Sequence, residues 1–287
     1  MEKKVRLCAF SDEASVDLKG QINALLRNGI SMMEIRGVDG ENIKDISYSK
    51  IKEIGKELKE NGIGVWSIGS PVGKNKVDFD FNKQIDDFKR LCEYAELLEC
   101  NHIRMFSFFT KNEEDALSCL GKLCEAAPKN IIMCHENEKG IFGDKFEDCV
   151  KIHKAYPQIK AVFDPANFIQ CKVDTLEAWD ALSPYVEYMH IKDAIFATKE
   201  VVPAGEGEGM IGDVIDKINE ATDDVVYLTL EPHLHIFTAY ASIDSHELKG
   251  KYSFSNRREA FDFAANALKK LLIQRGYRKD ENNQWIK

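Results

Sequence analysis

The sequence predicts a single-domain α/β protein and, within that class, a closed (β/α)8 TIM barrel. Short apolar runs alternate with longer amphipathic runs from Val5 onward, which is the pattern of repeated strand–helix units. We count eight such units, and a chain of 287 residues is long enough for one barrel of that size. No low-complexity segment or Pro/Ser-rich linker marks a domain boundary, so we expect one domain over residues 1–287.

Eight short apolar runs are the expected strands. Strands of a parallel barrel are covered on both faces, so they are typically continuous apolar runs. In order along the chain they are Val5–Phe10, Ser31–Arg36, Gly64–Gly69, His102–Phe106, Asn130–Glu136, Lys160–Asp164, Val186–Ile191 and Val226–Glu231. Eight strands alternating with helices in one chain favour the closed barrel over an open sheet.

The expected helices occupy the amphipathic intervals that follow the strands. Gly29 and Gly62 lie where a helix C-terminus needs a residue that tolerates the left-handed conformation, so they indicate two helix ends. The expected helices lie near Asp17–Arg27, Tyr48–Glu60, Phe81–Leu98, Glu113–Ala126, Lys145–Ala155, Thr175–Leu182, Gly212–Glu220 and Arg257–Gln274.

Two segments fall outside this pattern. The longest irregular stretch, residues 232–256, separates the last strand from the last helix and is rich in histidine and tyrosine. It contains His233, His235, Tyr240, His246 and Tyr252. A loop of this length is more often a functional cover than an idle connection, so we expect it to act as a lid. The C-terminal tail, residues 278–287, is polar and is expected to fray.

The charge balance argues against nucleic acid as the main partner. The chain has 48 acidic and 39 basic side chains, a formal net charge of −9, so its overall field repels polyanions. Hydrophobic residues make up 44% and charged residues 30%, which is ordinary for a soluble globular protein. No apolar run reaches the roughly 18 residues of a membrane span. We therefore expect a soluble protein whose main partner is not nucleic acid.

The eight cysteines are scattered through apolar surroundings and form no CxxC pair. This distribution, together with the absence of a signal sequence, predicts reduced thiols in a cytoplasmic protein. Most of these cysteines are expected to be small buried apolar residues without a metal or redox role.

Four of the later strand-like runs end in a side chain that can bind a metal. These side chains are Glu136, Asp164, His190 and Glu231, at the ends of strands five, six, seven and eight. The C-terminal ends of barrel strands form the active face, and neighbouring strands would bring the four together. Three carboxylates and one imidazole, with no thiolate, suit one divalent ion of Mn, Mg, Co or Zn.

Each of the four also has an ordinary structural interpretation. A carboxylate at a strand end often caps the next helix, a single histidine is often structural, and Asp164-Pro165 is a good helix-start sequence. All four at corresponding strand ends make the shared metal site the better hypothesis.

Several short motifs, in order along nearly the whole chain, resemble the sugar phosphate isomerase/epimerase family with its xylose isomerase-like barrel. The motifs are the runs 135–144 (HENEKGIFGD), 163–168 (FDPANF), 190–193 (HIKD), 202–207 (VPAGEG) and 230–233 (LEPH). The resemblance implies that the metal is held by Glu136, Asp164, His190 and Glu231. Members of that family include ketose 3-epimerases, hydroxypyruvate isomerase-like enzymes and inosose dehydratases, so the resemblance implies a chemistry more firmly than a substrate.

The chemistry expected from these residues is proton transfer next to a carbonyl group. A metal that polarises the carbonyl oxygen stabilises the enediolate formed when the neighbouring carbon loses a proton. Glu136 and Glu231 are the expected catalytic pair and would alternate as base and acid, as the resemblance to the epimerases also implies. The predicted function is therefore a metal-dependent isomerase or epimerase of a small sugar, sugar phosphate or related polyol ketone.

Five further residues are candidates for contact with the substrate. They are Lys192, His233, Arg104, Glu206 and Glu34. Lys192 shares a strand face with His190, and His233 continues from Glu231 if the strand persists. Glu34 and Arg36 form a pair on the second expected strand, where a buried structural ion pair is at least an equal alternative to substrate contact, and Arg104 has the same two interpretations. Glu206 lies in the glycine-containing loop 203–209, where plain turn formation is the alternative and no phosphate site is inferred.

Strand alternation also separates the neighbours of Glu136. His135 should point away from the site, whereas Glu138 should lie beyond the strand, in solvent or at the rim.

Three other functions fit parts of the same pattern. A dehydratase acting on an inosose-type cyclic polyol would use much the same metal ligands. An abasic-site endonuclease-like metallohydrolase shares this barrel type, but it would be expected to need more ligands and a basic track for DNA. A non-catalytic carbohydrate-binding barrel would have no need of the four-ligand set. Exposed apolar residues on the helices could support a homo-oligomer.

Overall fold

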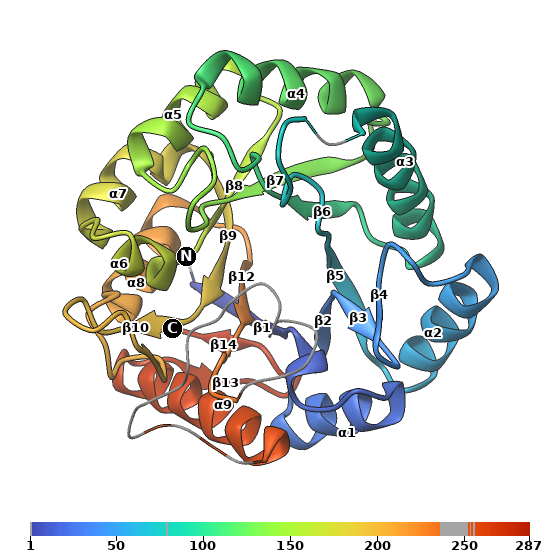
Figure 1. Cartoon of the computed structure of the whole chain (residues 1–287). Coiled ribbons are helices and arrows are strands. Elements are labelled where there is room, and N and C mark those ends of the chain that lie inside the picture. The colour runs from blue at the N-terminus through green and yellow to red at the C-terminus, as the bar shows by residue number, and fades with distance from the viewer. Residues whose placement is uncertain (1, 79, 236–251, 253, 255) are drawn as a thin grey trace.

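The computed structural model describes residues 2–78, 80–235, 252, 254 and 256–287. Eight parallel strands close into a barrel, because each pairs with its neighbours and the last, β12, pairs with the first, β1 (Figure 1). They are β1 (Lys4–Ala9), β2 (Met32–Ile35), β5 (Gly64–Gly69), β6 (His102–Met105), β7 (Ile132–Glu136), β8 (Lys160–Phe163), β9 (Val186–Ile191) and β12 (Val226–Leu230). The predicted TIM barrel is confirmed.

Helices surround the barrel and cover the outward faces of its strands (Figure 1). They are α1 (Leu18–Asn28), α2 (Tyr48–Glu60), α3 (Phe81–Leu97), α4 (Glu113–Ala126), α5 (Phe146–Ala155), α7 (Thr175–Leu182), α8 (Ile211–Ala221) and α9 (Arg257–Gln274). Their ends follow local capping chemistry. Asp17 accepts a hydrogen bond from Gly20 N at the start of α1, which ends at Gly29 with a left-handed φ of 61°.

Short elements occupy the loops at the carboxyl ends of the strands. Helix α6 (Pro165–Gln170) follows β8 directly; Asp164 caps it and Pro165 occupies its first turn. The 3-10 helix η2 (Ser183–Tyr185) lies directly before β9, at the opposite end of the barrel. The other short elements at the carboxyl ends are the 3-10 helix η1 (Ser11–Glu13) and the paired strands β3 (Gly37–Val38) with β4 (Glu41–Asn42) and β10 (Asp193–Ala194) with β11 (Val201–Val202). These elements shape the end of the barrel at which the candidate ligands lie.

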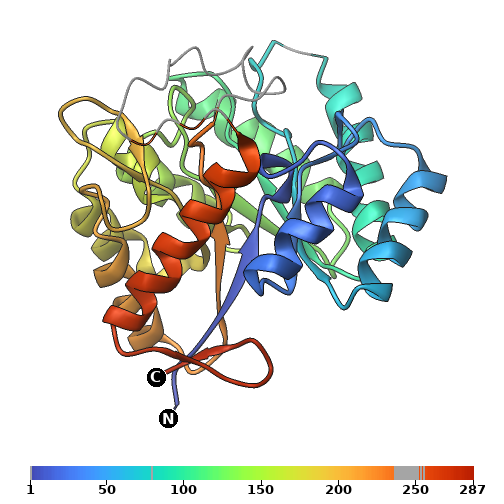
Figure 2. The same cartoon turned by 90° about the horizontal axis from the view of Figure 1, so that it is seen from below.

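The C-terminal tail does not fray, so this expectation was wrong. Strands β13 (Arg278–Lys279) and β14 (Trp285–Ile286) form a hairpin, and β14 pairs antiparallel with β1. Trp285 and Ile286 are only 4% and 7% exposed. The hairpin lies beside the N-terminus, at the amino end of the barrel strands (Figure 2). Two apolar residues at the end of a polar segment are therefore enough to anchor it.

An apolar layer fills the barrel interior below the candidate ligands. It comprises Cys134, Val162 and Tyr188, with Trp66 and Tyr227 packed against them. The rings of Trp66 and Tyr227 stack with centroids 3.5 Å apart. Three members of this layer lie two residues before Glu136, Asp164 and His190, and residues two apart share a strand face. The candidate ligands therefore form the next layer of the same interior.

Other expectations have mixed outcomes. All eight cysteines are free thiols, as the sequence predicts. No helix among the described residues is long and apolar enough to cross a membrane. Most of the expected lid, residues 236–251, 253 and 255, lies outside the described residues.

Candidate active site

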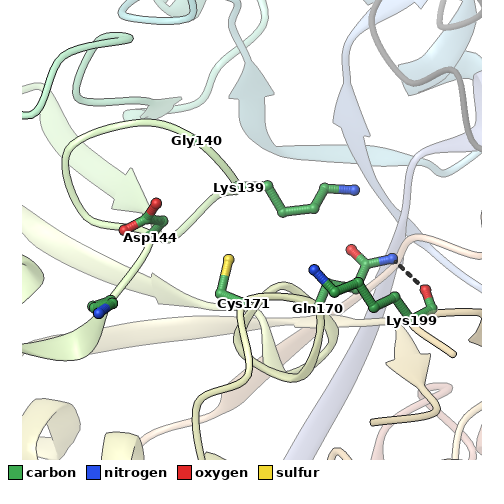
Figure 3. A pocket seen from close by; sticks show the side chains of 7 residues that line it. Lys139, Gly140, Asp144, Gln170, Cys171 and Lys199 are labelled. Carbon is green, nitrogen blue, oxygen red and sulfur yellow. Dashed lines mark hydrogen bonds between the residues drawn. The ribbon is translucent and has the colours of Figure 1, made fainter. Parts of the chain in front are cut away.

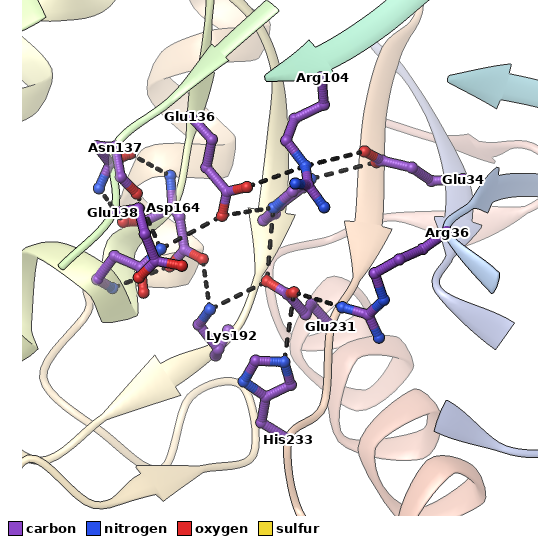
Figure 4. A network of polar contacts seen from close by, with 12 residues as sticks. Glu34, Arg36, Arg104, Glu136, Asn137, Glu138, Asp164, Lys192, Glu231 and His233 are labelled. Atoms are coloured by element: carbon purple, nitrogen blue, oxygen red, sulfur yellow. Dashed lines mark hydrogen bonds and ion pairs between the residues drawn. The ribbon is translucent and has the colours of Figure 1, made fainter. Parts of the chain in front are cut away.

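The carboxyl ends of β7, β8, β9 and β12 bring the four candidate ligands together. Each of Glu136, Asp164, His190 and Glu231 offers one ligand atom, and these atoms all lie within 4.8 Å of one another. All four side chains are buried, and none is more than 3% exposed. Figure 4 shows how Glu136, Asp164 and Glu231 converge with their charged neighbours.

His190 is held between carboxylates on both sides of its ring. Its Nδ1 lies 3.1 Å from Glu136 Oε1 and 3.5 Å from Glu231 Oε2, and its Nε2 lies 3.2 Å from Glu34 Oε2. Burial alone would lower the pKa of His190, but the carboxylates of Glu136 and Glu34 outweigh it and raise the pKa well above its ordinary value. The surrounding carboxylates therefore favour a positive charge at the imidazole, which can be a bound proton or a bound metal cation.

Glu136 is kept ionised by its neighbours. Arg104 Nε lies 3.1 Å from Glu136 Oε2, and Asn167 Nδ2 donates to Oε1 at 3.3 Å. Burial would raise the pKa of Glu136, but His190 and Arg104 together leave it below its ordinary value. A carboxylate in this state can accept a proton or bind a cation at neutral pH.

Glu231 has a different partner on each oxygen. Lys192 Nζ lies 3.0 Å from Oε2, while Arg36 Nη1 donates to Oε1 at 3.0 Å. Burial would raise the pKa of Glu231, but the positive charge of Lys192, followed by that of His233, brings it well below the ordinary value. The two glutamates thus share one pattern, in which an arginine holds one carboxylate oxygen and the other oxygen faces His190.

Asp164 is the most easily protonated of the three ligand carboxylates. Burial raises its pKa to about 6, with Lys192 lowering it and the nearby Glu231 and Glu136 raising it further. Its backbone is fixed by Asn137, whose side chain accepts from Asp164 N and donates to Asp164 O, both at 2.9 Å. The sequence did not single out Asn137; its position one residue after a strand-end glutamate was the only available signal.

A second acidic group adjoins the first and shares Glu231 with it. Ligand atoms of Glu13, Glu231 and His233 also lie within 4.8 Å of one another. However, Arg36 lies 3.2 Å from Glu13 and 3.0 Å from Glu231, and it also pairs with Asp12 at 2.9 Å. Its fixed positive charge repels a second cation at this position. Glu13 was missed because it lies in η1, beyond the strand whose pattern could be recognised.

His135, which precedes Glu136 on β7, and Glu138, which follows the end of that strand, have different surroundings. His135 points away from the site, as alternation predicts, and its Nε2 lies 2.8 Å from Ser107 Oγ. Glu138 was expected in solvent or at the rim, but it is only 8% exposed. Lys74, from the loop after β5, lies 2.7 Å from Glu138 Oε2. Burial would raise the pKa of Glu138, but Lys74 and then Lys192 lower it to about 2.

Of the five substrate-contact candidates, the structure brings four to the cluster. Lys192, His233, Arg104 and Glu34 all contact candidate ligands. Glu206 is exposed and accepts a hydrogen bond from Tyr252 at 3.0 Å.

The glycine loop that carries Glu206 wraps around the carboxylate of Asp193, which accepts hydrogen bonds from its backbone. Asp193 accepts from the backbone N of Gly205, Gly207 and Gly209 at 2.9, 3.2 and 2.8 Å. A side chain at Gly207 would clash with the Asp193 carboxylate. The glycines therefore form a turn around Asp193, which matches the plain-turn interpretation of this loop.

A surface pocket of about 380 Å³ lies over the loops that follow β7, β8 and β9 (Figure 3). It is lined by Lys139, Gly140, Asp144, Lys145, Gln170, Cys171 and Lys199. Gln170 ends α6, the helix that Asp164 begins, and a rise of 1.5 Å per residue puts these two residues roughly 9 Å apart. Burial raises the pKa of Cys171 to about 11, so its thiol stays protonated at neutral pH and is not a nucleophile.

The comparison with protein-family models gives a match over most of the chain. The model described as xylose isomerase-like TIM barrel matches residues 22–249. The chain belongs to the xylose isomerase-like TIM barrel family. No curated protein sequence matches it significantly.

Solved structures similar to this xylose isomerase-like barrel include proteins with different activities. The probable 3-DHS dehydratase AsbF from Bacillus anthracis has 17% identity and a TM-score of 0.69, over 93% of this chain and 98% of that one. IOLI protein with a binding zinc atom has 16% identity and a TM-score of 0.68, over 94% and 99%. D-allulose 3-epimerase from Methylomonas sp. in complex with D-allulose has 14% identity and a TM-score of 0.69, over 95% and 98%. At these identities the likeness shows the shared fold.

The donor set of this xylose isomerase-like barrel fits a divalent cation. Three carboxylates and one imidazole are ligands that Mn, Mg, Co or Zn accepts. The cluster is also short of positive charge. Its carboxylates are Asp12, Glu13, Glu34, Glu136, Glu138, Asp164 and Glu231, and its fixed cations are Arg36, Lys74, Arg104 and Lys192. A divalent ion would offset most of this excess of acidic groups, which burial makes costly.

Proposed function

We propose that the protein is a divalent-metal-dependent isomerase or epimerase of a small sugar, sugar phosphate or related polyol ketone. The observation that carries this proposal is the convergence of Glu136, Asp164, His190 and Glu231 within 4.8 Å in the buried end of the barrel. Membership of the xylose isomerase-like family and the epimerase among the similar structures support the same class of chemistry.

The residues that would hold the metal are Glu136, Asp164, His190 through Nδ1, and Glu231. When bound, a divalent cation such as Mn, Mg, Co or Zn would polarise a substrate carbonyl and make the neighbouring C–H group more acidic. Asp164 and Asn167 lie at the start of α6, so the helix fixes the carboxylate relative to Glu136. This leaves the two glutamates as the groups that can move a proton.

In the proposed reaction, Glu136 takes the proton from the carbon next to the carbonyl. Its low pKa keeps it in the accepting form at neutral pH. Glu231, on the other side of His190, is the second proton carrier. For an epimer, Glu231 must first carry a proton, which it gives to the opposite face of the same carbon while Glu136 keeps the proton that it took. For an isomer, the proton returns to the former carbonyl carbon, and the proton of the neighbouring hydroxyl group moves to the former carbonyl oxygen. Glu136 and Glu231 are the proposed proton carriers whether the product is an epimer or an isomer.

Lys192 and His233 are our candidates for contact with substrate oxygens. Lys192 presents its ammonium group to Asp164 and Glu231 at 2.8 and 3.0 Å, within the cluster itself. His233 is 17% exposed and its Nε2 lies 3.3 Å from Glu231 Oε1, so it lies between the cluster and solvent. Both groups can donate hydrogen bonds to hydroxyl or carbonyl oxygens.

A dehydratase acting on a cyclic polyol is the second candidate, and the position of Lys192 favours it. In that reaction a glutamate accepts the C–H proton, the C–O bond of the neighbouring carbon breaks, and Lys192 protonates the departing hydroxyl to give water. The buried ammonium group of Lys192 lies 2.8 Å from Asp164 and 3.0 Å from Glu231, so the cluster contains a proton donor next to two candidate ligands.

The deciding experiment is a substrate screen in D2O. Purified protein is incubated with ketoses, ketose phosphates and inososes in the presence of Mn, Mg, Co or Zn, and products are followed by NMR. We expect metal-dependent deuterium incorporation at the carbon next to the carbonyl. An epimer or isomer supports the first candidate, and an unsaturated product supports the second. Absence of exchange with all these compounds and metals would contradict both.

A further inference from the structure

Glu34 and His190 form a fully buried pair that crosses the barrel interior. Glu34 lies on β2 and His190 on β9, and the two strands are not neighbours in the sheet. Glu34 Oε2 lies 3.2 Å from His190 Nε2, and both side chains are 0% exposed. The opposite ring nitrogen, Nδ1, faces Glu136 and Glu231. The two nitrogens of this fully buried ring therefore have different environments.

Both oxygens of Glu34 are already used. Tyr188 Oη donates to Glu34 Oε1 at 2.9 Å, and Arg104 Nε lies 3.9 Å from the same oxygen. The hydroxyl oxygen of Tyr188 also lies 3.4 Å from Ser67 Oγ, and Tyr188 is fully buried. Glu34 is thus fully buried and held in place by Tyr188 and Arg104. Its one contact with a candidate ligand is with His190.

We propose that Glu34 is a positioning residue, which accepts the Nε2–H of His190 and so keeps the Nδ1 lone pair directed at the cation site. A ligating histidine whose other N–H is held by a carboxylate is fixed in tautomer and orientation, and it is a stronger ligand. This inference rests on the proposed function, because the role of Glu34 is to support metal binding by His190. It gives Glu34 a role through His190 in place of direct substrate contact.

The surroundings of Glu34 make glutamine an informative replacement. Glutamine has the same size, but it has only one acceptor oxygen. The Tyr188 hydroxyl and the Arg104 guanidinium both favour this oxygen at the Oε1 position. The amide N–H2 then faces His190 Nε2 and donates to it, which moves the ring proton to Nδ1. Glu34→Gln should therefore block the nitrogen that faces the cation site, while leaving the packing unchanged.

A matched control is available at the other end of the barrel. His102, the first residue of β6, lies 3.1 Å from Glu187 on β9 through its Nε2. This is also a contact between a carboxylate and His Nε2, but it does not involve the candidate ligands. Glu187→Gln should perturb His102 and leave cation binding unchanged.

The test measures Zn²⁺ binding to the full-length chain by calorimetry, and it assigns the metal-bound nitrogen of His190 by ¹⁵N NMR of the zinc-loaded protein. For wild type we expect zinc on Nδ1 and a proton on Nε2. Glu34→Gln should bind Zn²⁺ about 10- to 100-fold more weakly and lose the Nε2–H signal. Glu187→Gln should match wild type in both measurements. A structural role alone would lower thermal stability without moving the nitrogen assignment.

The outcomes separate this inference from the proposed function. Wild-type protein that fails to bind Zn²⁺, Mn²⁺, Mg²⁺ or Co²⁺ would contradict the proposed function, and with it the role of Glu34. Wild-type binding matched by Glu34→Gln, with Nε2–H retained, would overturn the inference alone. If Glu34→Gln does not fold, Tyr188→Phe replaces it. That change releases one oxygen of Glu34 and should weaken Zn²⁺ binding several-fold, and unchanged binding would overturn the inference.

Discussion

The ammonium group of Lys192 lies 2.8 Å from Oδ2 of Asp164, and both side chains are nearly fully buried. The same ammonium group reaches Glu231 at 3.0 Å, so it contacts two of the four candidate ligands. A fixed positive charge at this position neutralises the carboxylates in the metal-free protein, and it repels any cation that binds beside it. Loss of Lys192 should therefore raise the affinity for a cation and lower the stability of the metal-free protein.

Lys192→Met tests this opposition. Loss of the ammonium group leaves the buried Asp164 without its cationic partner and leaves Glu231 with Arg36 on one oxygen only, which should destabilise the metal-free protein by about 3–5 kcal/mol. The same change removes a repulsion, so Mn²⁺ should bind at least about tenfold more tightly. Thermal unfolding with and without Mn²⁺ should show a lower metal-free midpoint and a larger shift on addition. Lys74→Met, which removes the partner of Glu138, is the control and should leave Mn²⁺ affinity near that of wild type.

Glu136→Gln and Glu231→Gln should abolish proton transfer while keeping the fold. Each change removes a group that accepts or donates a proton, and such groups typically contribute about 10²- to 10⁴-fold to the rate. Deuterium exchange at the carbon next to the substrate carbonyl is the measurement. Unchanged exchange in either variant would show that its glutamate is not a proton carrier. Glu187→Gln, at the other end of the barrel, should exchange as fast as wild type.

Asp164→Asn and His190→Ala should each remove metal from the purified protein. We expect about one divalent ion per wild-type chain purified without chelator, and well below one in the variants. Binding to wild type should also weaken as the pH falls from 7 to 5. Burial raises the pKa of Asp164 to about 6, and protonation removes a ligand charge. Elemental analysis and titrations at the two pH values are the measurements, and full metal content in both variants would contradict the ligand assignment.

His153 should make stability depend on pH. It is fully buried, and its ring lies 3.0 Å from the carbonyl of Ile159 through Nδ1. Burial lowers the pKa of His153 from 6.5 to about 4. The unfolded chain therefore takes up a proton near pH 6.5 that the folded chain takes up only near pH 4. Titration of His153 leaves the free energy of unfolding unaffected above pH 6.5. This free energy falls by about 1.4 kcal/mol for each pH unit between pH 6.5 and the folded-state pKa of about 4.

His153→Phe isolates this contribution, because a phenyl ring can keep the stacking on Tyr185. Urea unfolding at pH 7 and pH 5 is the measurement. The loss of stability between the two values should be smaller in the variant by roughly 2 kcal/mol. An equal loss in both proteins would show that His153 is not the group that titrates.

The positions of the strands and helices could be predicted from sequence because their signals are local. Apolar runs and capping residues placed all eight barrel strands and the helices that surround them, with ends shifted by at most two residues. The C-terminal hairpin could not be predicted in this way. Its segment is polar, and Trp285 becomes buried only by pairing with Val5 on the first strand. Contacts between distant parts of the chain leave no local pattern.

The candidate site shows the same division. Strand ends pointed to Glu136, Asp164, His190 and Glu231, whose ligand atoms lie together in the structure. Glu13 and Asn137 were missed, because their positions depend on loop geometry beyond a strand end. Glu138 was misplaced for the same reason, since alternation makes no prediction for a residue after the strand has ended. The ion pairs of Arg36 and Arg104 were recognised as alternatives, but their partners could not be chosen from sequence.

The distribution of charge along the chain bears on the order of assembly. The four candidate ligands all come from residues 136–231, whereas Arg36, Lys74 and Arg104 come from the first 104 residues. A half-barrel made from the later strands would carry a concentrated negative charge until the earlier strands dock against it. The earlier half is synthesised first, and it contributes Asp12, Glu13 and Glu34 as well as its three basic side chains. The seam between β1 and β12 can close only after the last strand has emerged, so the ion pair of Arg36 with Glu231 forms only when the barrel closes.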